Sequence, residues 1–395
     1  MARALSVVPD VRVVVVIRDS RVRRKQNPEP FSVVVKVDRL FRIRRFVSEH
    51  ATVLRTFPWI LIHKWHRNLL WQIPVLFLAR FFSRRTKTID DFSWLTESVD
   101  CDVYCCMGVS NRTAQVFDAA KRANSRTLLF IVSDADVDER YVWVPGFVNQ
   151  HGDAGSRCAE AIYNADLIAC QTDVQMDRLA RSFKRESLQF PNPFDHDDWM
   201  QKAKRADSMP PTIPDRFALW IGRSDRHHKR PQILLRLARK CPDVRFVMVM
   251  NTHDESVAVD VHGQCPSNVV IVERIPFDEM PHYFERSCLF ISTGSAEFEG
   301  FPNVFLQAAA SGTPVVTLEA DPGFIESHET GIVCHSDFEK LVSAVNDLWT
   351  DSSECRRLGL NGRSYLTKYH SATSTRERML SILKTLSTSS DCTIR

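Results

Sequence analysis

One segment in the second half of the chain, Glu297–Ala308, combines carboxylates, a glycine turn and the start of an apolar helix. Pro302 suits the first position of that helix, because the N–H that proline lacks would have no partner there. The N–H groups of Asn303, Val304 and Phe305 would then face outward at the positive end of the helix dipole. Such an end binds anions, so the segment predicts a site for a phosphate or diphosphate.

A carboxylate next to this anion site must serve another part of the ligand. Phosphates would repel it, whereas sugar hydroxyls can donate hydrogen bonds to it. Glu299 directly precedes the Gly300-Phe301 turn, and we therefore prefer it to Glu297 as the acid of the site. The predicted ligand is a phosphorylated sugar.

Two cations follow a second strand pattern. Phe217–Arg223 reads as a strand that runs through Gly222 and ends in Arg223, and Lys229 comes six residues later. Ligands of open α/β sheets lie outside the carboxyl ends of the strands, so both cations should stand at the edge that holds Glu299. Together with a helix N-terminus they can stabilise a leaving diphosphate without a metal. We expect the neighbouring histidines, His227 and His228, at the surface.

The elements around these residues alternate between strand and helix. Continuous apolar runs of four to seven residues are followed by periodic helical stretches, and this order predicts an α/β protein with two parallel sheets. The strands are expected at 103–106, 127–132, 167–171, 217–221, 244–250, 269–272, 288–292, 313–318 and 331–334. A polar, proline-containing stretch, 201–214, is the predicted linker. The first 95 residues do not continue the series, although 11–17 and 31–37 are candidate strands.

Charge and cysteine content limit the class of protein. Residues 1–100 contain 19 Lys and Arg against 9 Asp and Glu, so this part is basic and the remainder acidic. The basic part indicates an anionic partner, either a membrane surface or nucleic acid. Eleven scattered cysteines without a C-x-x-C pair favour a reduced, cytoplasmic setting.

The best membrane-binding candidate is the apolar stretch 57–82. Its longest uncharged run, Asn68–Ala79, is too short to span a bilayer. Its tryptophans and flanking arginines would suit an amphipathic helix lying in the interface (Trp59, Trp65, Trp71, Arg80, Arg84 and Arg85). The alternative is an apolar helix packed on a sheet.

Three motifs together resemble the retaining glycosyltransferases of family 4, which have the two-domain GT-B fold. They are W-I-G-R-x5-K-R-P (Trp220 to Pro231), E-G-F-P-N-x3-Q-A (Glu299 to Ala308) and S-G-T-P-V-V (Ser311 to Val316). The similarity extends over about 100–371 and includes A-D-L-I-A-C-Q-T (Ala165 to Thr172) and the Pro191-Asn-Pro193 turn. It implies two Rossmann-like domains: an acceptor-side domain, 1–205, atypical and basic in its first 95 residues, and a donor domain, 215–365. A final helix, 366–387, would return to the first domain.

The resemblance also implies roles for single residues. Arg223 and Lys229 would bind the donor diphosphate and assist its departure, and Glu299 would contact the donor sugar. Gln307 stands where the family has a second Glu that holds the ribose hydroxyls. Donor contacts are expected from Gly222, Gly300, Phe301, Asn303 and Val304, and an acceptor-side contact from Asp134.

Two departures from the family pattern keep a second hypothesis open. Ser133 stands where the family usually has a His near the reacting sugar, and Gln307 replaces the second Glu. The chain could then be a nucleotide-sugar-binding or scaffold protein of the same fold. The Asp134-Ala-Asp136-Val-Asp138 run also permits a metal-binding hypothesis, which the spacing supports weakly.

The preferred hypothesis is a metal-independent, retaining, hexosyl-type glycosyltransferase without a cofactor. Its partners would be a nucleotide-diphosphate sugar and a carbohydrate or lipid-linked acceptor, as in cell-envelope polysaccharide or glycolipid synthesis. The resemblance implies no nucleic-acid partner. We expect the protein in the cytoplasm, with peripheral attachment to the inner face of the membrane.

Overall fold

In the computed structural model the chain divides into two compact units, Met1–Asp102 and Val103–Arg395. The structure describes residues 1–6, 8, 11–19, 32–37, 43, 46–47, 50–53, 60–62, 65–85, 95, 99–149, 151–204 and 209–388. Each unit is considered by itself.

The first unit contains two small sheets and one long helix. Strands β1 (Val14–Asp19) and β2 (Ser32–Val37) pair in parallel, and β3 (Ala51–Val53) pairs antiparallel with β4 (Ile60–Ile62). A short helix, α1 (Ala2–Leu5), precedes them, and helix α3 (Leu69–Arg85) follows. The two strands predicted in the first 40 residues are thus present.

The stretch 57–82 is not one helix, which corrects the sequence-based expectation. Ile60–Ile62 is the strand β4, and the helix begins only at Leu69. β-branched residues favour an extended strand, and an antiparallel partner is available next to it. Trp59 lies outside the described residues. None of the described helices has the length and hydropathy of a bilayer-spanning segment.

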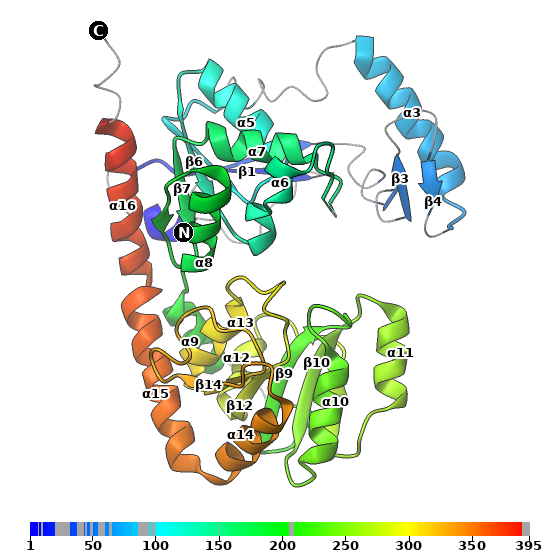
Figure 1. Ribbon diagram of the computed structural model, residues 1–395, viewed down its shortest axis with the longest axis vertical. Helices are drawn as coiled ribbons and strands as arrows, with labels where there is room; N and C mark the ends of the chain where they lie inside the picture. The colour runs from blue at the N-terminus through cyan, green and yellow to red at the C-terminus, as the bar shows by residue number, and fades with distance from the viewer. Residues whose placement is uncertain are drawn as a thin grey trace. The chain divides into compact units, whose positions relative to one another are not determined.

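The second unit begins with a parallel four-stranded sheet in the order β5-β6-β7-β8. Figure 1 shows its strands β6 and β7 beside the helices α5 and α7. Its strands are β5 (Val103–Met107), β6 (Arg126–Phe130), β7 (Leu167–Cys170) and β8 (Leu188–Gln189). The helices are α5 (Asn111–Arg122), η1 (Asp134–Val137), α6 (Arg140–Trp143), α7 (Gly155–Asn164), α8 (Asp173–Arg178) and η2 (Leu179–Phe183). Buried side chains from these strands and helices form one core.

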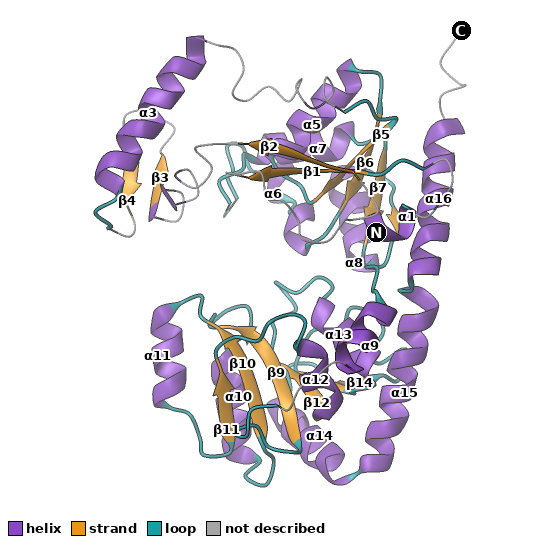
Figure 2. Cartoon of the chain, turned by 180° about the vertical axis from the view of Figure 1, so that it is seen from behind, coloured by secondary structure: helices purple, strands orange, loops and turns teal. Residues whose placement is uncertain are grey.

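A parallel six-stranded sheet follows, in the order β11-β10-β9-β12-β13-β14 (Figure 2). Its strands are β9 (Phe217–Arg223), β10 (Phe246–Asn251), β11 (Val269–Val272), β12 (Ser287–Ser292), β13 (Val315–Thr317) and β14 (Gly331–Val333). The first three strands grow outward from β9, and β12 then starts the other half. The strand order therefore reverses between β9 and β12, which is the topological switch point where open α/β sheets bind ligands.

Helices cover both faces of this sheet because its strand residues alternate between two cores. Trp220 and Met248 lie in one core with α10 (Pro231–Lys240), α11 (Glu255–Gly263) and α14 (Phe338–Thr350). Leu219 and Val247 lie in the other with α9 (His196–Lys204), α12 (Met280–Arg286) and α13 (Asn303–Ser311). Helix α9 occupies the first residues of the predicted linker.

The predicted last helix, 366–387, falls on two helices in the structure, α15 (Ser352–Tyr369) and α16 (Ala372–Thr388). The break lies at the buried His370, whose backbone oxygen accepts a hydrogen bond from Phe194 N at 2.8 Å. The His370 Nδ1 lies 2.6 Å from the Asn192 carbonyl oxygen. The break therefore joins the turn that follows the four-stranded sheet to the helices that follow the six-stranded one.

Candidate active site

The loops after β9 and β12 meet at the switch point, and a buried tryptophan supports both. The ring of Trp220 passes beneath Gly222, where a Cβ would lie only 2.4 Å from it, so no larger residue fits there unless the ring shifts. Trp220 Nε1 donates to Thr293 Oγ1 at 2.9 Å, and that hydroxyl donates to the Lys229 carbonyl oxygen at 2.7 Å. Gly222 thus has a packing role that positions Lys229.

Arg230 fastens the two loops together. Its backbone is left-handed, with φ at 50°, and its guanidinium donates to the carbonyl oxygens of Thr293 at 2.7 Å and Gly294 at 2.9 Å. The same group pairs with Glu319 at 2.5 Å. A non-glycine residue in this conformation is costly, and these contacts offset that cost. The clamp fixes the backbone on both sides of the predicted site.

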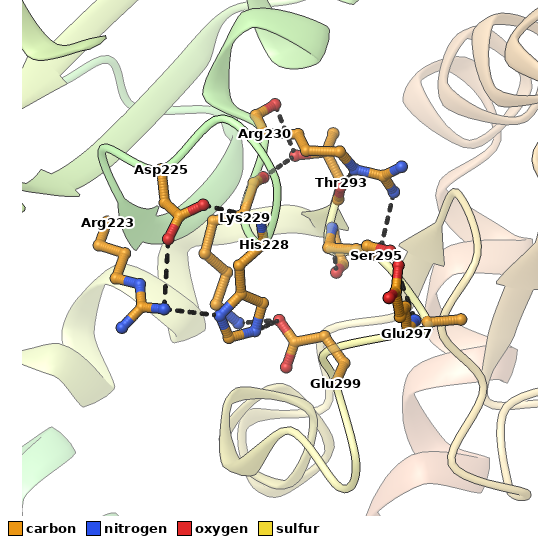
Figure 3. Close-up of polar contacts among 12 residues, drawn as sticks. Arg223, Asp225, His228, Lys229, Arg230, Thr293, Ser295, Glu297 and Glu299 are labelled. Atoms are coloured by element: carbon orange, nitrogen blue, oxygen red, sulfur yellow. Dashed lines mark hydrogen bonds and ion pairs between the residues drawn. The ribbon is translucent and has the colours of Figure 1, made fainter. Parts of the chain in front are cut away.

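Lys229 and Glu299, two predicted site residues, form a direct ion pair (Figure 3). The Glu299 side chain is only 7% exposed and that of Lys229 is 21% exposed. His228 Nε2 lies 3.1 Å from the same carboxylate oxygen, Oε1. Burial alone would raise the pKa of Glu299, but the contact with His228 and the charge of Lys229 outweigh it and lower the pKa. Glu299 is therefore a carboxylate at neutral pH.

The second carboxylate oxygen of Glu299, Oε2, has no hydrogen-bond partner among the residues that the structure describes. It remains able to accept from a ligand hydroxyl. Glu297 differs: its side chain is exposed, and its backbone N–H donates weakly to Ser295 Oγ at 3.4 Å. Glu299, and not Glu297, thus lies in the ion-pair cluster with Lys229.

Arg223 leaves the end of β9 and lies beside the same cluster. One of its terminal nitrogens is 3.2 Å from Asp225 Oδ2 and 3.0 Å from His228 Nδ1. The side chain is 43% exposed, while its Nε is buried without a partner among the described residues. A buried donor without an acceptor costs free energy, and a bound oxyanion would remove that cost.

Helix α13 starts one residue later than predicted, with Pro302 as its N-cap. Phe305 N already donates to the Pro302 carbonyl oxygen at 3.0 Å, so it does not face outward as expected. For Asn303 and Val304, the structure shows no acceptor for the backbone N–H among the described residues. Asn303 Oδ1 accepts from Asn192 Nδ2 at 3.0 Å.

The other residues predicted on the donor side differ in burial and in contacts. Gln307 is half-buried on α13, and its side chain has no hydrogen bond to the described part of the chain. Phe301 is 8% exposed and stacks on Phe324 and against His370, so the structure gives it a packing role. Gly300 packs closely against Asp134, the residue predicted on the acceptor side. A Cβ on Gly300 would lie 3.2 Å from Asp134 Oδ1.

The acidic run after β6 does not form one cluster. Asp134 accepts from Gln175 Nε2 at 3.0 Å, and Asp138 pairs with Arg140 at 2.6 Å. Asp136 accepts three backbone N–H groups, of Val109, Val132 and Ser133, at 2.8 to 3.0 Å. Within the described ranges, no three His, Cys, Asp or Glu side chains are placed to hold a metal ion. Ser133 caps the turn of η1, its Oγ accepting from Ala135 N at 3.2 Å.

Sequence reasoning missed His228 and Arg230. It placed His228 at the surface, whereas the imidazole lies between Arg223 and Glu299. A signal did exist: Asp225 can accept the N–H groups two and three residues later, as it does for His227 and His228 at 2.9 and 2.8 Å, and this folds the loop back.

Part of the chain matches a known family model. Residues 215–351 match the model of the glycosyl transferases group 1. The "O-antigen chain mannosyltransferase C" of Escherichia coli is 21% identical over 194 residues, 48% of this chain and 52% of that protein. The chain thus spans about half the length of this curated relative.

Solved structures show the same fold at low sequence identity. The sucrose-phosphate synthase of Thermosynechococcus elongatus matches with a TM-score of 0.66 at 15% identity, over 98% of this chain and 92% of that one. A UDP-forming α,α-trehalose-phosphate synthase from Burkholderia xenovorans gives 0.65 at 14% identity, over 95% and 94%. Anabaena Alr3699/HepE in complex with UDP gives 0.58 at 14%, over 74% and 80%.

The parallel sheets, the switch-point site and the family match of 215–351 agree with one another. The chain has the GT-B fold of these solved structures, and its residues 215–351 match the glycosyl transferases group 1.

Proposed function

We propose that the protein transfers a sugar from a nucleotide-diphosphate sugar to an acceptor hydroxyl. The observation that carries the proposal is that the two carboxylate oxygens of Glu299 have different surroundings. Its Oε1 is held by Lys229 and faces His228, while Oε2 remains without a partner among the described residues. A carboxylate fixed in this way can accept from sugar hydroxyls next to two cations, Arg223 and Lys229, that suit a diphosphate.

In the proposed reaction the bond between the sugar C1 and the diphosphate oxygen breaks, and the electron pair leaves with the diphosphate. The acceptor hydroxyl oxygen bonds to C1, and its proton passes to an oxygen of the departing diphosphate. Arg223 and Lys229 stabilise the negative charge that develops on the diphosphate, as do the free N–H groups of Asn303 and Val304. These groups supply the charge that a metal ion would provide, so we propose a metal-independent transferase without a cofactor.

The finer assignments rest on the family resemblance. We infer retention of the anomeric configuration and a hexosyl donor, with Gln307 at the donor ribose and Asp134 on the acceptor side. Phe301, Gly222 and Gly300 would shape the donor site through packing. The domain bounds 1–205, 215–365 and 366–387 stay predictions.

The rival hypothesis is a nucleotide-sugar-binding or scaffold protein, and Ser133 is the observation that favours it. Its hydroxyl caps η1, so no imidazole is present at that position. The two hypotheses differ in turnover. A panel of nucleotide-diphosphate sugars, read by release of the nucleoside diphosphate, tests the proposal: slow donor hydrolysis supports the transferase, and a thermal shift without release from any donor supports the binder.

For the acceptor we propose a lipid-linked glycan at an anionic membrane, because the first unit presents an exposed apolar stripe. Helix α3 packs Leu69 and its neighbours on Val47, and the opposite face exposes Leu70 (67%), Trp71 (51%) and Leu78 (59%). Trp65, before the helix, is 65% exposed. Exposed tryptophans beside a basic segment suit a lipid interface.

Attachment of this kind is reversible, because each Lys or Arg near the surface contributes only about 1 kcal/mol and salt screens it within about 10 Å. The chain should co-sediment with anionic vesicles at low salt and be released at high salt. Trp71→Ser should weaken binding, and Phe298→Ser, at an exposed aromatic residue of the second unit, is the control. Equal recovery with neutral and anionic vesicles would contradict the proposal. The proposed location is the inner face of a cytoplasmic membrane, which agrees with the free cysteines among the described residues.

A further inference from the structure

The loop after β9 contains a histidine, His228, that has no role in the proposed reaction. His228 lies between the diphosphate-binding Arg223 and the sugar-binding Glu299 (Figure 3). Its two ring nitrogens face opposite kinds of group: Nδ1 is 3.0 Å from an Arg223 nitrogen, and Nε2 is 3.1 Å from Glu299 Oε1. The exposed His227 next to it has no such position.

These two neighbours determine where the proton of the imidazole lies. A guanidinium can only donate, so His228 Nδ1 must accept and carries no proton. Nε2 then carries the proton, and it lies 3.1 Å from Glu299 Oε1 as an electrostatic contact that lacks hydrogen-bond geometry. The neutral tautomer that the Arg223 contact requires is Nε2–H, and it turns the N–H edge of the ring towards the Glu299 carboxylate. In this form the ring connects a cation and an anion without adding a charge.

We propose that His228, as a neutral Nε2–H imidazole, is the positioning residue that aligns Arg223 with Glu299. The inference rests on the proposed function, because it assigns Arg223 to the diphosphate and Glu299 to the sugar. It explains how one loop sets the distance between two binding groups that come from β9 and from the loop after β12.

Protonation of His228 would break this alignment. A proton on Nδ1 would face the Arg223 guanidinium at 3.0 Å, so two donors and two positive charges would oppose each other. The other charged groups around the ring cannot prevent this: Asp225 already pairs with Arg223 at 3.2 Å, and Lys229 adds a further positive charge. Arg223 would turn away from the donor site, and donor use would fall in acid.

Three variants separate positioning from a structural role. His228→Gln keeps an acceptor and a donor on one planar group but cannot gain a proton, His228→Leu removes both contacts, and His227→Leu is the matched control one residue away. We expect His228→Leu to lose about 10- to 100-fold in kcat/KM for the donor, the loss of hydrogen bonds to charged groups, whereas His227→Leu keeps the wild-type value. His228→Gln should remain within about threefold of wild type at pH 8.

The pH profile and the tautomer are the decisive measurements. Wild-type kcat/KM should fall when the solution is made acidic, and His228→Gln should lack the part of the fall that comes from the ring. Nitrogen NMR of the ring in the full chain should show the Nε2–H form. The proposal is overturned by an Nδ1–H tautomer, by an acid limb that persists in His228→Gln, or by His228→Leu with the kinetics of His227→Leu.

Failure of the proposed function would look different. A wild-type chain that neither binds nor hydrolyses any donor refutes the transferase, and the tautomer measurement then decides the role of His228 alone. If His228→Leu does not fold, the pH profile of His228→Gln and the tautomer still test the inference.

Discussion

Removing Lys229 should destabilise the protein more than removing Glu299, its ion-pair partner. Lys229→Ala leaves a carboxylate that is 7% exposed, whereas Glu299→Ala leaves an ammonium that is 21% exposed and reaches water more easily. Removing one partner of a fully buried pair costs about 3–5 kcal/mol. We expect about 3 kcal/mol for Lys229→Ala, because His228 still faces the carboxylate, and about 1–2 kcal/mol for Glu299→Ala.

Thermal unfolding measures this asymmetry. One kcal/mol corresponds to about 2 °C for a unit of this size, so Lys229→Ala should melt about 6 °C below wild type and Glu299→Ala about 2–4 °C below. The double variant should lose less than the sum of the two, by about 1–3 kcal/mol, because no unpaired charge remains. Glu354→Ala, in an exposed pair with Arg357 on α15, is the control and should leave the melting temperature unchanged.

The stability that the Lys229–Glu299 pair contributes should depend on pH. Because the pKa of Glu299 is lowered in the folded protein, the pair stabilises the fold above the ordinary carboxyl pKa of about 4.3, and this stability is lost as the pH falls through the folded value. In Lys229→Ala the burial of the carboxylate weighs more, so the deficit should be largest at pH 8 and shrink towards pH 5. Equal melting temperatures for the two single variants, or additive losses in the double variant, would refute this reasoning. Neither single variant nor the double variant should retain more than about 1% of wild-type turnover.

Three further predictions follow from single positions. Gln307→Glu should tighten binding of the nucleoside diphosphate measured by calorimetry, through a charge-assisted hydrogen bond of about 1.5–3 kcal/mol gross, and Gln307→Ala should weaken it; unchanged affinity in both would place the side chain away from the ribose. Gly294→Ala would put a Cβ 2.7 Å from Glu299 Oε1 and should lower turnover about tenfold or more with little change in melting temperature, since the carboxylate has to move; wild-type turnover would contradict this. Burial lowers the pKa of His370 to about 4, so its contribution to stability is complete above pH 6.5 and is lost between pH 6.5 and 4, by about 3 kcal/mol at most. Chemical denaturation of wild type and His370→Gln across that range measures this, and identical pH dependences would exclude His370 as the cause.

Much of the α/β series was predictable because its strands are continuous apolar runs. Strand β11 has the predicted bounds, and β12 begins one residue early. Helix α11 was missed because its apolar residues do not follow one clear helical face. The strand β4 was taken for helix because only pairing with β3, a contact between distant residues, distinguishes the two.

The candidate site was predictable to the extent that strand ends determine it. Arg223 is the last residue of β9, Lys229 lies in the loop that follows it, and Glu299 lies in the loop after β12, so the rule for strand ends predicted them at one edge of the sheet. His228 was not predictable in the same way. Its place depends on the left-handed backbone of Arg230 and on the clamp to Thr293 and Gly294, which are tertiary contacts that no residue pattern shows.

Charge balance in the site suggests how a donor would bind and how its product would leave. Arg223 faces Asp225 and Lys229 faces Glu299, so both cations assigned to the diphosphate already have a carboxylate partner. In the proposed complex a diphosphate would share Lys229 with Glu299, and it would give the buried Nε of Arg223 a hydrogen-bond acceptor. Because Lys229 also pairs with Glu299, the affinity for a diphosphate alone would be lower. The affinity for a whole donor would not be lowered, since its sugar hydroxyls would donate to the Glu299 carboxylate. Binding energy is then greatest while sugar and diphosphate are joined, and the nucleotide product is released more easily than the donor.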